Sequence, residues 1–289
     1  MGFTGHMIIG SFMFSISVWW MFNIFRDYVL SKRKNSSSDF TSRISYLCST
    51  CRKVPIEAIW KVVAFTFVLL CEVGSSRLVF IDPKDGGFRA GAITNLQHMT
   101  MYGMFLVHAC VDLMAWKLPV PDGASTVTLA LALVWSGVSI HSGHNKNEFL
   151  ILIHILPTYV MFVVAALLII EFYNNYSCFL ASAFRVFGTM LLGTWFCQMA
   201  FVSFDRHELI GNAPNPHWDQ SDPRNIQMLV ALFGGHIILD LIVSMLFYTA
   251  MYLRYGRGGY EYKTKELGEE HEKLMGIKSP EFQEQKLIC

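Results

Sequence analysis

Charged side chains are scarce in this sequence. Asp, Glu, Lys and Arg make up 16% of its 289 residues, whereas hydrophobic residues make up 53%. A water-soluble domain carries about 25% charged residues, so the composition argues against a soluble globular fold. The net charge is only +1 and no basic stripe is interleaved with aromatic residues, so we expect no nucleic-acid binding. The composition instead predicts an integral membrane protein with the lipid bilayer as its main partner.

The amino terminus lacks the basic region and the small-residue cleavage site of a secretory signal peptide. We therefore expect its apolar run to remain as a membrane span. A span needs about 20 mostly apolar residues, and seven runs qualify: 6–25, 56–76, 92–116, 124–141, 149–171, 179–204 and 226–253. The predicted fold class is an all-α membrane protein, a bundle of seven transmembrane helices. The predicted domains are a transmembrane domain over 1–254 and a charged cytoplasmic tail over 255–289.

Basic residues are few in three of the loops. Segments 26–55 and 254–289 carry seven Lys and Arg residues each, whereas the loops 77–91, 142–148 and 205–225 hold six between them. Basic segments stay on the cytoplasmic side, so we predict the N-terminus outside or lumenal and the C-terminus cytoplasmic. The glycosylation sequons at Asn35 and Asn175 should then remain unmodified. The plasma membrane or the endomembrane system is the expected location.

Cysteine pairs facing the oxidising side are also missing, so we expect no disulfides. Cys48 and Cys51 have metal-ligand spacing, but no second pair follows and a structural zinc needs four ligands. A zinc role there is disfavoured. The basic loop 26–55 and the tail 255–289 are instead expected to contact protein partners.

The apolar runs contain several histidines, a residue type that is uncommon in membrane spans. The stretch HSGHNKNEFLILIH, residues 141–154, holds three of them. Ionisable side chains are costly at membrane depth and mark functional sites there. With the predicted spans, His98 and His154 lie about 9 Å below the outer edge and His236 about 15 Å below it. Only His108 and Asp112 are placed in the inner half, and for them we favour mutual hydrogen bonding without a ligand.

Imidazoles at similar depth on separate helices could bind zinc, copper or iron, or act as axial ligands of haem. The predicted metal ligands are His98, His144, His154 and His236, with His6 and Glu72 as further candidates. Asp240 lies four residues after His236 and shares its helix face. Asp240 and Gln198 are therefore the predicted hydrogen-bond partners behind the ligands. The open alternative is that these groups bond only to one another, and bundle packing is the favoured role of Trp195 and Gln198.

An ordered set of short motifs resembles a known family. They are GHMIIG at 5–10, QHMTMYG at 97–103, HSGH at 141–144 followed by His154, GTWFCQMAF at 193–201, and His236. The sequence resembles the transmembrane protein 45 / transmembrane epididymal protein family from residue 5 to about residue 253. The resemblance implies a multi-pass membrane protein with His6, His98, His144, His154, Trp195, Gln198 and His236 at recurring positions. His108 and Asp240 depart from the family pattern, and the HSGH spacing leaves His141 without an assigned role.

The family has no agreed biochemical activity, so three functions stay open. An enzyme or redox protein would use a bound metal or haem, for example to activate water. A non-enzymatic scaffold, trafficking factor or small-ligand receptor would need no metal. A channel or transporter is the third, and it is disfavoured because too few charges are expected in the inner half of the bundle.

Overall fold

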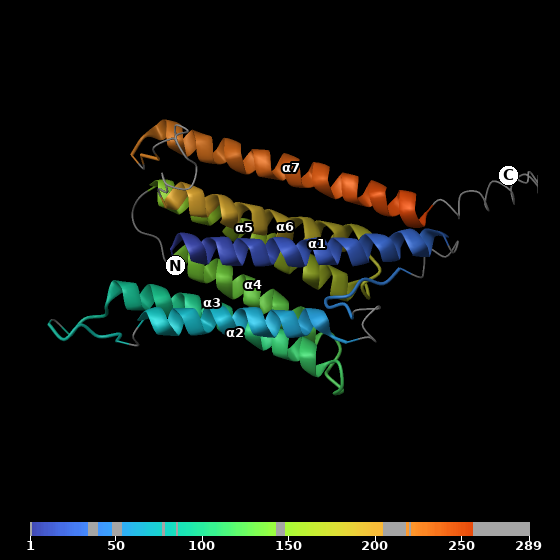
Figure 1. Ribbon diagram of the computed structural model, residues 1–289, viewed down its shortest axis with the longest axis horizontal. Helices are drawn as coiled ribbons and strands as arrows, with labels where there is room; N and C mark the ends of the chain where they lie inside the picture. Colours follow the sequence, from blue (N-terminus) through green and yellow to red (C-terminus); the bar gives the residue numbers. More distant parts are fainter. Residues whose placement is uncertain are drawn as a thin grey trace, which may run out of the picture.

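The computed structural model describes residues 2–33, 40–47, 54–76, 79–84, 86–142, 148–204, 218–219 and 221–256. Within these residues the chain is all-α, as predicted (Figure 1). The helices are α1 (Phe3–Arg33), α2 (Ile56–Ser76), α3 (Ala90–Met114), α4 (Ala124–Ser142), α5 (Glu148–Tyr173), α6 (Phe179–Ser203) and α7 (Pro223–Tyr255). Each predicted span therefore coincides with one helix.

Helix ends differ from the expected spans mainly in α1 and α7. Helix α1 continues to Arg33, well past the expected end at residue 25, and buries Asn23 and Ser31 along the way. Helix α7 begins at Pro223, where the Asp222 side chain accepts a hydrogen bond from the Arg224 backbone N–H at 2.9 Å. A capping Asp followed by proline is a favourable helix start, which accounts for the earlier beginning.

Five of the described helices are long and apolar enough to cross a membrane: α1, α4, α5, α6 and α7. Helices α2 and α3 are 21 and 25 residues long, which suffices for a crossing, but they are not in this set. Helix α2 carries Glu57, Lys61 and Glu72. Length and composition thus support membrane crossing for five helices of the seven expected.

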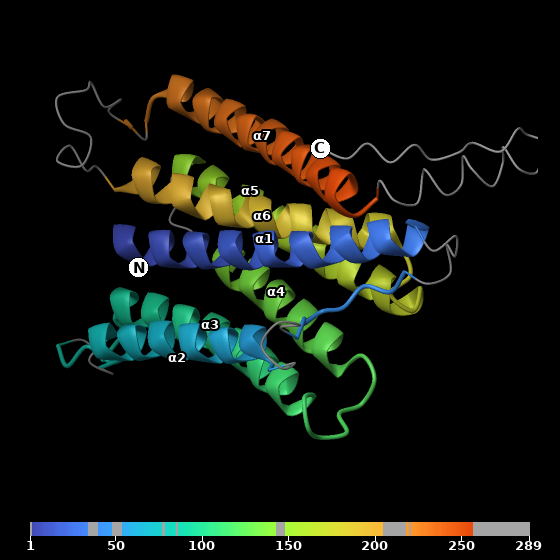
Figure 2. The same cartoon turned by 45° about the vertical axis from the view of Figure 1, so that its right-hand side comes forward.

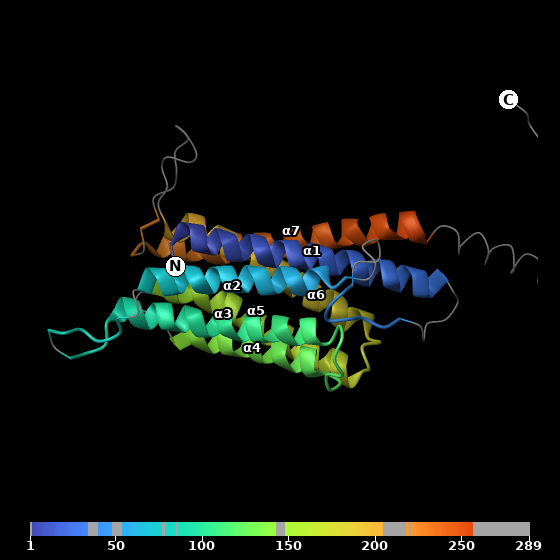
Figure 3. The ribbon, with the colours of Figure 1, turned by 60° about the horizontal axis from the view of Figure 1, so that its bottom comes forward.

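The helices lie side by side and alternate in direction (Figure 1). The N-terminus and the end of α7 are therefore at opposite ends of the bundle, which we call the N-terminal end and the C-terminal end. Helix α1 packs most extensively on α6, which also contacts α5 and α7. Figures 1 and 2 show the α2–α3 hairpin on the opposite side from α7. The hairpin joins the bundle through α3 on α4, which lie side by side in Figure 3.

Helices α1 and α6 approach each other at two glycines. A Cβ atom on Gly193 would lie 2.5 Å from the backbone nitrogen of Phe14, and one on Gly10 would lie 2.6 Å from Cys197 Sγ. Neither distance leaves room for a side chain. Small residues allow helices in membranes to pack closely, so these glycines set the distance between the two central helices.

Residues 40–47 pack against the C-terminal end of the bundle. Phe40, Ile44 and Tyr46 are buried there, and the Ser42 N–H donates to the Tyr176 carbonyl at 2.8 Å. We expected 26–55 to be one exposed basic loop. That prediction was wrong for two stretches, because α1 takes up the part to residue 33 and 40–47 is packed.

Several predictions fall on residues outside the described ranges. They concern Asn35, the pair Cys48 and Cys51, His144, and the tail beyond residue 256. The described cysteines include Cys71, Cys110, Cys178 and Cys197, and these four are free. Contacts of loop 26–55 and the tail with protein partners stay a prediction.

Replacing Gly193 with Ala tests the α1–α6 contact. The added methyl group meets the α1 backbone, so we expect a loss of about 1–3 kcal/mol, typical of overpacking. Gly235→Ala on α7 is the control, because a Cβ there meets nothing within 4 Å. Thermal unfolding of the purified protein in mild detergent should show a lower midpoint for the first variant only. Equal midpoints would mean that the helices can separate at no cost.

Candidate functional site

Three histidines line one cavity near the N-terminal end. The cavity has a volume of about 80 Å³, and His6 from α1, His98 from α3 and His154 from α5 contribute to its wall. Tyr102 and Ser136 add hydroxyl groups, and the remaining lining is apolar or aromatic. We call this space the histidine cavity. It brings together side chains that are far apart in the sequence.

Each of the three rings has a neighbour at its Nδ1 atom. Nδ1 of His6 lies 3.2 Å from the Gly2 carbonyl oxygen, and Nδ1 of His154 lies 2.7 Å from that of Leu150. Nδ1 of His98 is 3.6 Å from a Glu72 carboxylate oxygen. A partner on one ring nitrogen fixes the orientation of an imidazole, as it does for metal-binding histidines.

The structure brings together part of the predicted metal-ligand set. His98 and His154 line the histidine cavity with His6, and Glu72 lies beside His98. His236 does not line it; this ring lies edge-on to Trp195, with centroids 5.7 Å apart. Among the described residues, no group of three or more His, Cys, Asp or Glu is arranged to hold a metal ion.

Asp240 and Gln198, the predicted hydrogen-bond partners of the ligands, lie on α7 and α6. The Asp240 carboxylate accepts a hydrogen bond from the Thr194 hydroxyl at 2.8 Å, which joins α7 to α6. Trp195 is fully buried and donates to the Ile153 carbonyl at 3.0 Å. Gln198 is half-buried on the same helix. These contacts fit the packing role that we favoured for Trp195.

A second, wider space lies beside the histidine cavity. It has a volume of about 690 Å³ and is lined only by α1 and α2, including Phe12, Trp60, Val63 and Phe67. Phe12 lines both spaces, so its ring forms part of the wall between them. We call this space the α1–α2 crevice. Its α2 side consists of exposed apolar side chains, as expected for a surface that faces lipid.

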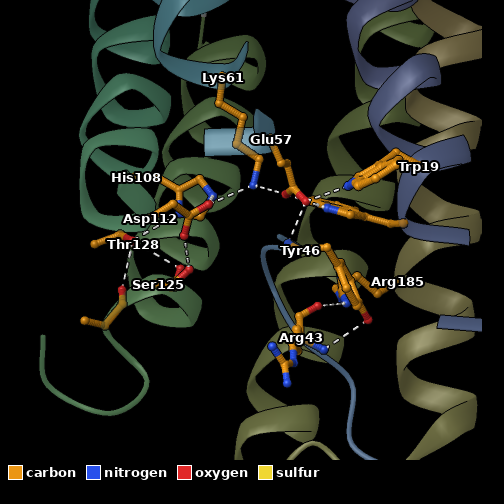
Figure 4. A network of polar contacts seen from close by, with 12 residues as sticks. Trp19, Arg43, Tyr46, Glu57, Lys61, His108, Asp112, Ser125, Thr128 and Arg185 are labelled. Atoms are coloured by element: carbon orange, nitrogen blue, oxygen red, sulfur yellow. Dashed lines mark hydrogen bonds and ion pairs between the residues drawn. The ribbon is translucent and has the colours of Figure 1, made fainter. Parts of the chain in front are cut away.

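At the C-terminal end a buried lysine joins two carboxylates (Figure 4). Nζ of Lys61 lies 2.6 Å from Glu57 and 2.8 Å from Asp112, and all three side chains are at most 3% exposed. Glu57 also accepts hydrogen bonds from the indoles of Trp19 and Trp20 at 2.9 and 2.8 Å. The two helices of the α2–α3 hairpin are thus tied together by charge.

The packed segment 40–47 completes this polar network. The Tyr46 backbone N–H donates to Glu57 at 2.8 Å, and its hydroxyl accepts from the Arg43 N–H at 3.2 Å. Burial raises the pKa of the Tyr46 phenol, so that the hydroxyl stays neutral. A second ion pair joins Arg185 of α6 to Glu171 of α5 at 2.5 Å.

Trp20 lies between the two buried cations. Lys61 Nζ is 5.1 Å and Arg185 Cζ is 4.9 Å from its ring centroid, which is within the range of cation–π attraction. Both cations and His108 line a second small cavity of about 40 Å³, which we call the ion cavity. The indole and the carboxylates together offset the cost of burying these charges.

The buried charges correct one prediction. We placed only His108 and Asp112 in the inner half, but Glu57, Lys61, Glu171 and Arg185 lie at the same end of the bundle. The sequence did contain the signal. All four positions fall within the expected spans, and Glu57 and Lys61 have the i,i+4 spacing of a helical ion pair. The argument against a channel or transporter from lack of charge was therefore wrong.

An aromatic layer separates the two small cavities. Phe12, Phe65 and Phe105 line both of them. The ring centroids of Phe12 and Phe65 are 5.0 Å apart, and those of Phe65 and Phe105 are 5.1 Å apart. Polar groups therefore gather on both sides of a hydrophobic barrier in the middle of the bundle.

Replacing Lys61 with Met tests the network. The change leaves two buried carboxylates without their cation, and removal of one partner from a buried ion pair costs about 3–5 kcal/mol. We expect a large drop in the thermal midpoint measured in detergent. Lys117→Met, at an exposed position, should change it little. The same midpoint for both variants would show that Lys61 does not hold the hairpin in place.

Residues 122–249 match a protein family described as "Family of unknown function (DUF716)". This stretch runs from the α3–α4 connection into α7 and includes His154, Trp195 and His236, whereas His6 and His98 precede it. The description assigns no activity. Over these residues, the chain is similar to an uncharacterised family whose matched part contains helices able to cross a membrane.

Proposed function

We propose that the protein is a seven-span membrane protein that binds a small amphipathic molecule in the histidine cavity, as a non-enzymatic receptor or carrier. The observation behind this proposal is the meeting of His6, His98 and His154, from three helices, in one cavity. Membership of the transmembrane protein 45 / transmembrane epididymal protein family is part of the proposal. So is a location in the plasma membrane or the endomembrane system.

The size and lining of the two spaces suggest the class of ligand. Pockets for drug-sized molecules measure about 300–1,000 Å³, so the histidine cavity, at about 80 Å³, suits only a small head group. The α1–α2 crevice, at about 690 Å³, suits an apolar chain. A rotation of the shared Phe12 ring would join the two spaces. The expected ligand is a single-chain lipid with a small hydroxyl head group.

Hydrogen bonding supports a hydroxyl head group. A neutral imidazole offers one donor and one acceptor, and a hydroxyl group is both. The Tyr102 and Ser136 side chains in the same wall are hydroxyls too. The apolar remainder of the wall would exclude water, which makes an unsatisfied polar group costly and favours a ligand that satisfies it.

A metal ion is the second candidate for the histidine cavity. The carbonyl contacts at Nδ1 of His6 and His154 resemble the hydrogen bonds that orient metal-binding histidines. The side chains would have to move closer together, since the described residues contain no ready group of three ligands. Haem does not fit a cavity of about 80 Å³ without a larger rearrangement.

Photocrosslinking tests the lipid proposal. The probe is a long-chain fatty alcohol with a diazirine in its chain, added to purified full-length protein in lipid nanodiscs. We expect labelled peptides from α1 and α2, competed by the untagged alcohol. His154→Leu should weaken labelling about tenfold, the equivalent of one lost hydrogen bond of about 1.4 kcal/mol. His236→Leu is the matched control, because His236 does not line the cavity.

Equal labelling of both variants would exclude the histidine cavity as the head-group site. Elemental analysis of the same preparations separates the metal candidate from the lipid. Zinc, copper or iron at near one equivalent, lost in His154→Leu and retained in His236→Leu, would replace the lipid proposal with a metal centre.

The orientation and the span count of the proposal are tested by glycosylation in mammalian cells. With seven spans and the N-terminus outside, a sequon placed in a short tag before Met1 should acquire a glycan. The native sequon at Asn175 lies in the α5–α6 connection at the C-terminal end and should stay bare. Glycan on Asn175 with none on the tag would invert the orientation, and glycan on both would refute an odd number of spans before Asn175.

A further inference from the structure

His108 is a buried side chain whose Nδ1 atom has a fixed partner. It is 1% exposed, and Nδ1 lies 3.3 Å from the hydroxyl oxygen of Thr128. The Thr128 hydroxyl donates its only proton toward the carbonyls of Ala124 and Ser125, at 2.8 and 3.1 Å. With its proton engaged by these carbonyls, the oxygen accepts from His108. In this arrangement the hydrogen of the neutral ring is on Nδ1.

The other ring nitrogen faces a carboxylate. Nε2 of His108 lies 3.3 Å from an Asp112 oxygen, and it is buried without a hydrogen-bond partner. When Nδ1 carries the hydrogen, Nε2 presents a lone pair to the negatively charged oxygen, and the two repel. A proton on Nε2 converts this contact into a charge-assisted hydrogen bond, which is about twice as strong as a neutral one.

The charged groups around His108 carry a net charge of −1. Asp112 faces His108 from the same helix, and Lys61 of α2 faces it with Glu57 as its second partner. Arg185 of α6 faces it across the ion cavity and is paired with Glu171 of α5. From α4, the groups in contact with this pair are the hydroxyls of Ser125 and Thr128. Three carboxylates thus meet two permanent cations, and a protonated His108 brings the sum to zero.

An opening at the C-terminal end lies next to this buried pair. Asp112 and Ser125 line an opening of about 450 Å³, together with Arg43 and Asp122. Toward the N-terminal end, the rings of Phe12, Phe65 and Phe105 close the ion cavity. The opening thus lies on the C-terminal side of the pair, and the aromatic layer lies on its other side.

We infer that Nε2 of His108, held against Asp112, is a proton-binding site next to the opening at the C-terminal end. The ring is neutral while Nε2 carries no proton, and acidification supplies one. The bound proton shares the Asp112 oxygen with Lys61 and weakens the hold of Lys61 on α3. This inference does not depend on a ligand in the histidine cavity.

Nitrogen NMR of histidine-labelled, full-length protein in lipid nanodiscs tests the site. The His108 signals are assigned by their loss in His108→Gln. At neutral pH we expect hydrogen on Nδ1 only, and on stepwise acidification both nitrogens should become protonated. Asp112→Asn should weaken proton binding at least about tenfold, which is one pH unit. Asp240→Asn, a buried carboxylate bound to Thr194, should leave the His108 titration unchanged.

Thr128→Val provides a test that preserves every charge. It removes the acceptor at Nδ1, so we expect the neutral ring of this variant to acquire hydrogen on Nε2. The inference is overturned if wild-type His108 carries hydrogen on Nε2 at neutral pH, if its signals do not change on acidification, or if both Asp variants titrate alike. If the His108 signals change with sodium concentration at constant pH, the position binds a metal cation instead of a proton.

Discussion

The ammonium group of Lys61 is the charge on which the C-terminal half of the bundle depends. An isolated cation cannot remain charged in an apolar interior, because its lost hydration must be replaced by partners at short distance. Glu57 and Asp112 replace it, and each of them needs further donors in turn. These donors are the indoles of α1, the Tyr46 backbone N–H of segment 40–47 and the Ser125 hydroxyl of α4. One buried charge thereby fixes five parts of the chain.

This constraint explains how the α2–α3 hairpin stays in the bundle. The hairpin contacts the rest chiefly through α3 on α4, and the α1–α2 crevice separates much of α2 from α1. At the C-terminal end, however, Trp19 and Trp20 of α1 reach Glu57. The crevice can therefore widen toward the N-terminal end while the ion network holds the other end. A lipid chain could enter between α1 and α2 without separating the hairpin from the bundle.

The aromatic layer gives the two ends of the bundle separate chemistry. His98 and His108 are ten residues apart on α3, about 15 Å at the rise of an α-helix. Phe105 lies between them, and it stacks on Phe65. Charge on one side is therefore only weakly stabilised by groups on the other. A site for a neutral head group and a site for a proton can coexist because this layer keeps water from connecting them.

The length of the apolar runs predicted all seven helices, because such a run leaves the backbone few alternatives in a membrane. His98 and His154, placed at similar depth from the sequence, line one cavity. Depth could not decide which way a ring points around the helix axis, and His236 faces Trp195 instead. Nor could it show α1 continuing to Arg33, since the last turns of this helix carry the polar residues Ser31, Lys32 and Arg33.

The charges that sequence reasoning missed illustrate a general limit of reading residues one at a time. Glu57, Lys61, Glu171 and Arg185 each lie close to a span end, where a charge is usually explained by its nearness to water. Their burial depends on residues 40–47, which close that end of the bundle. No local pattern in 40–47 indicates that role. A charge near a membrane boundary is buried or solvated according to what the loops do. The spacing of Glu57 and Lys61 could indicate one ion pair, whereas the wider ion network depends on the loop, the helices and the partner charges packed together.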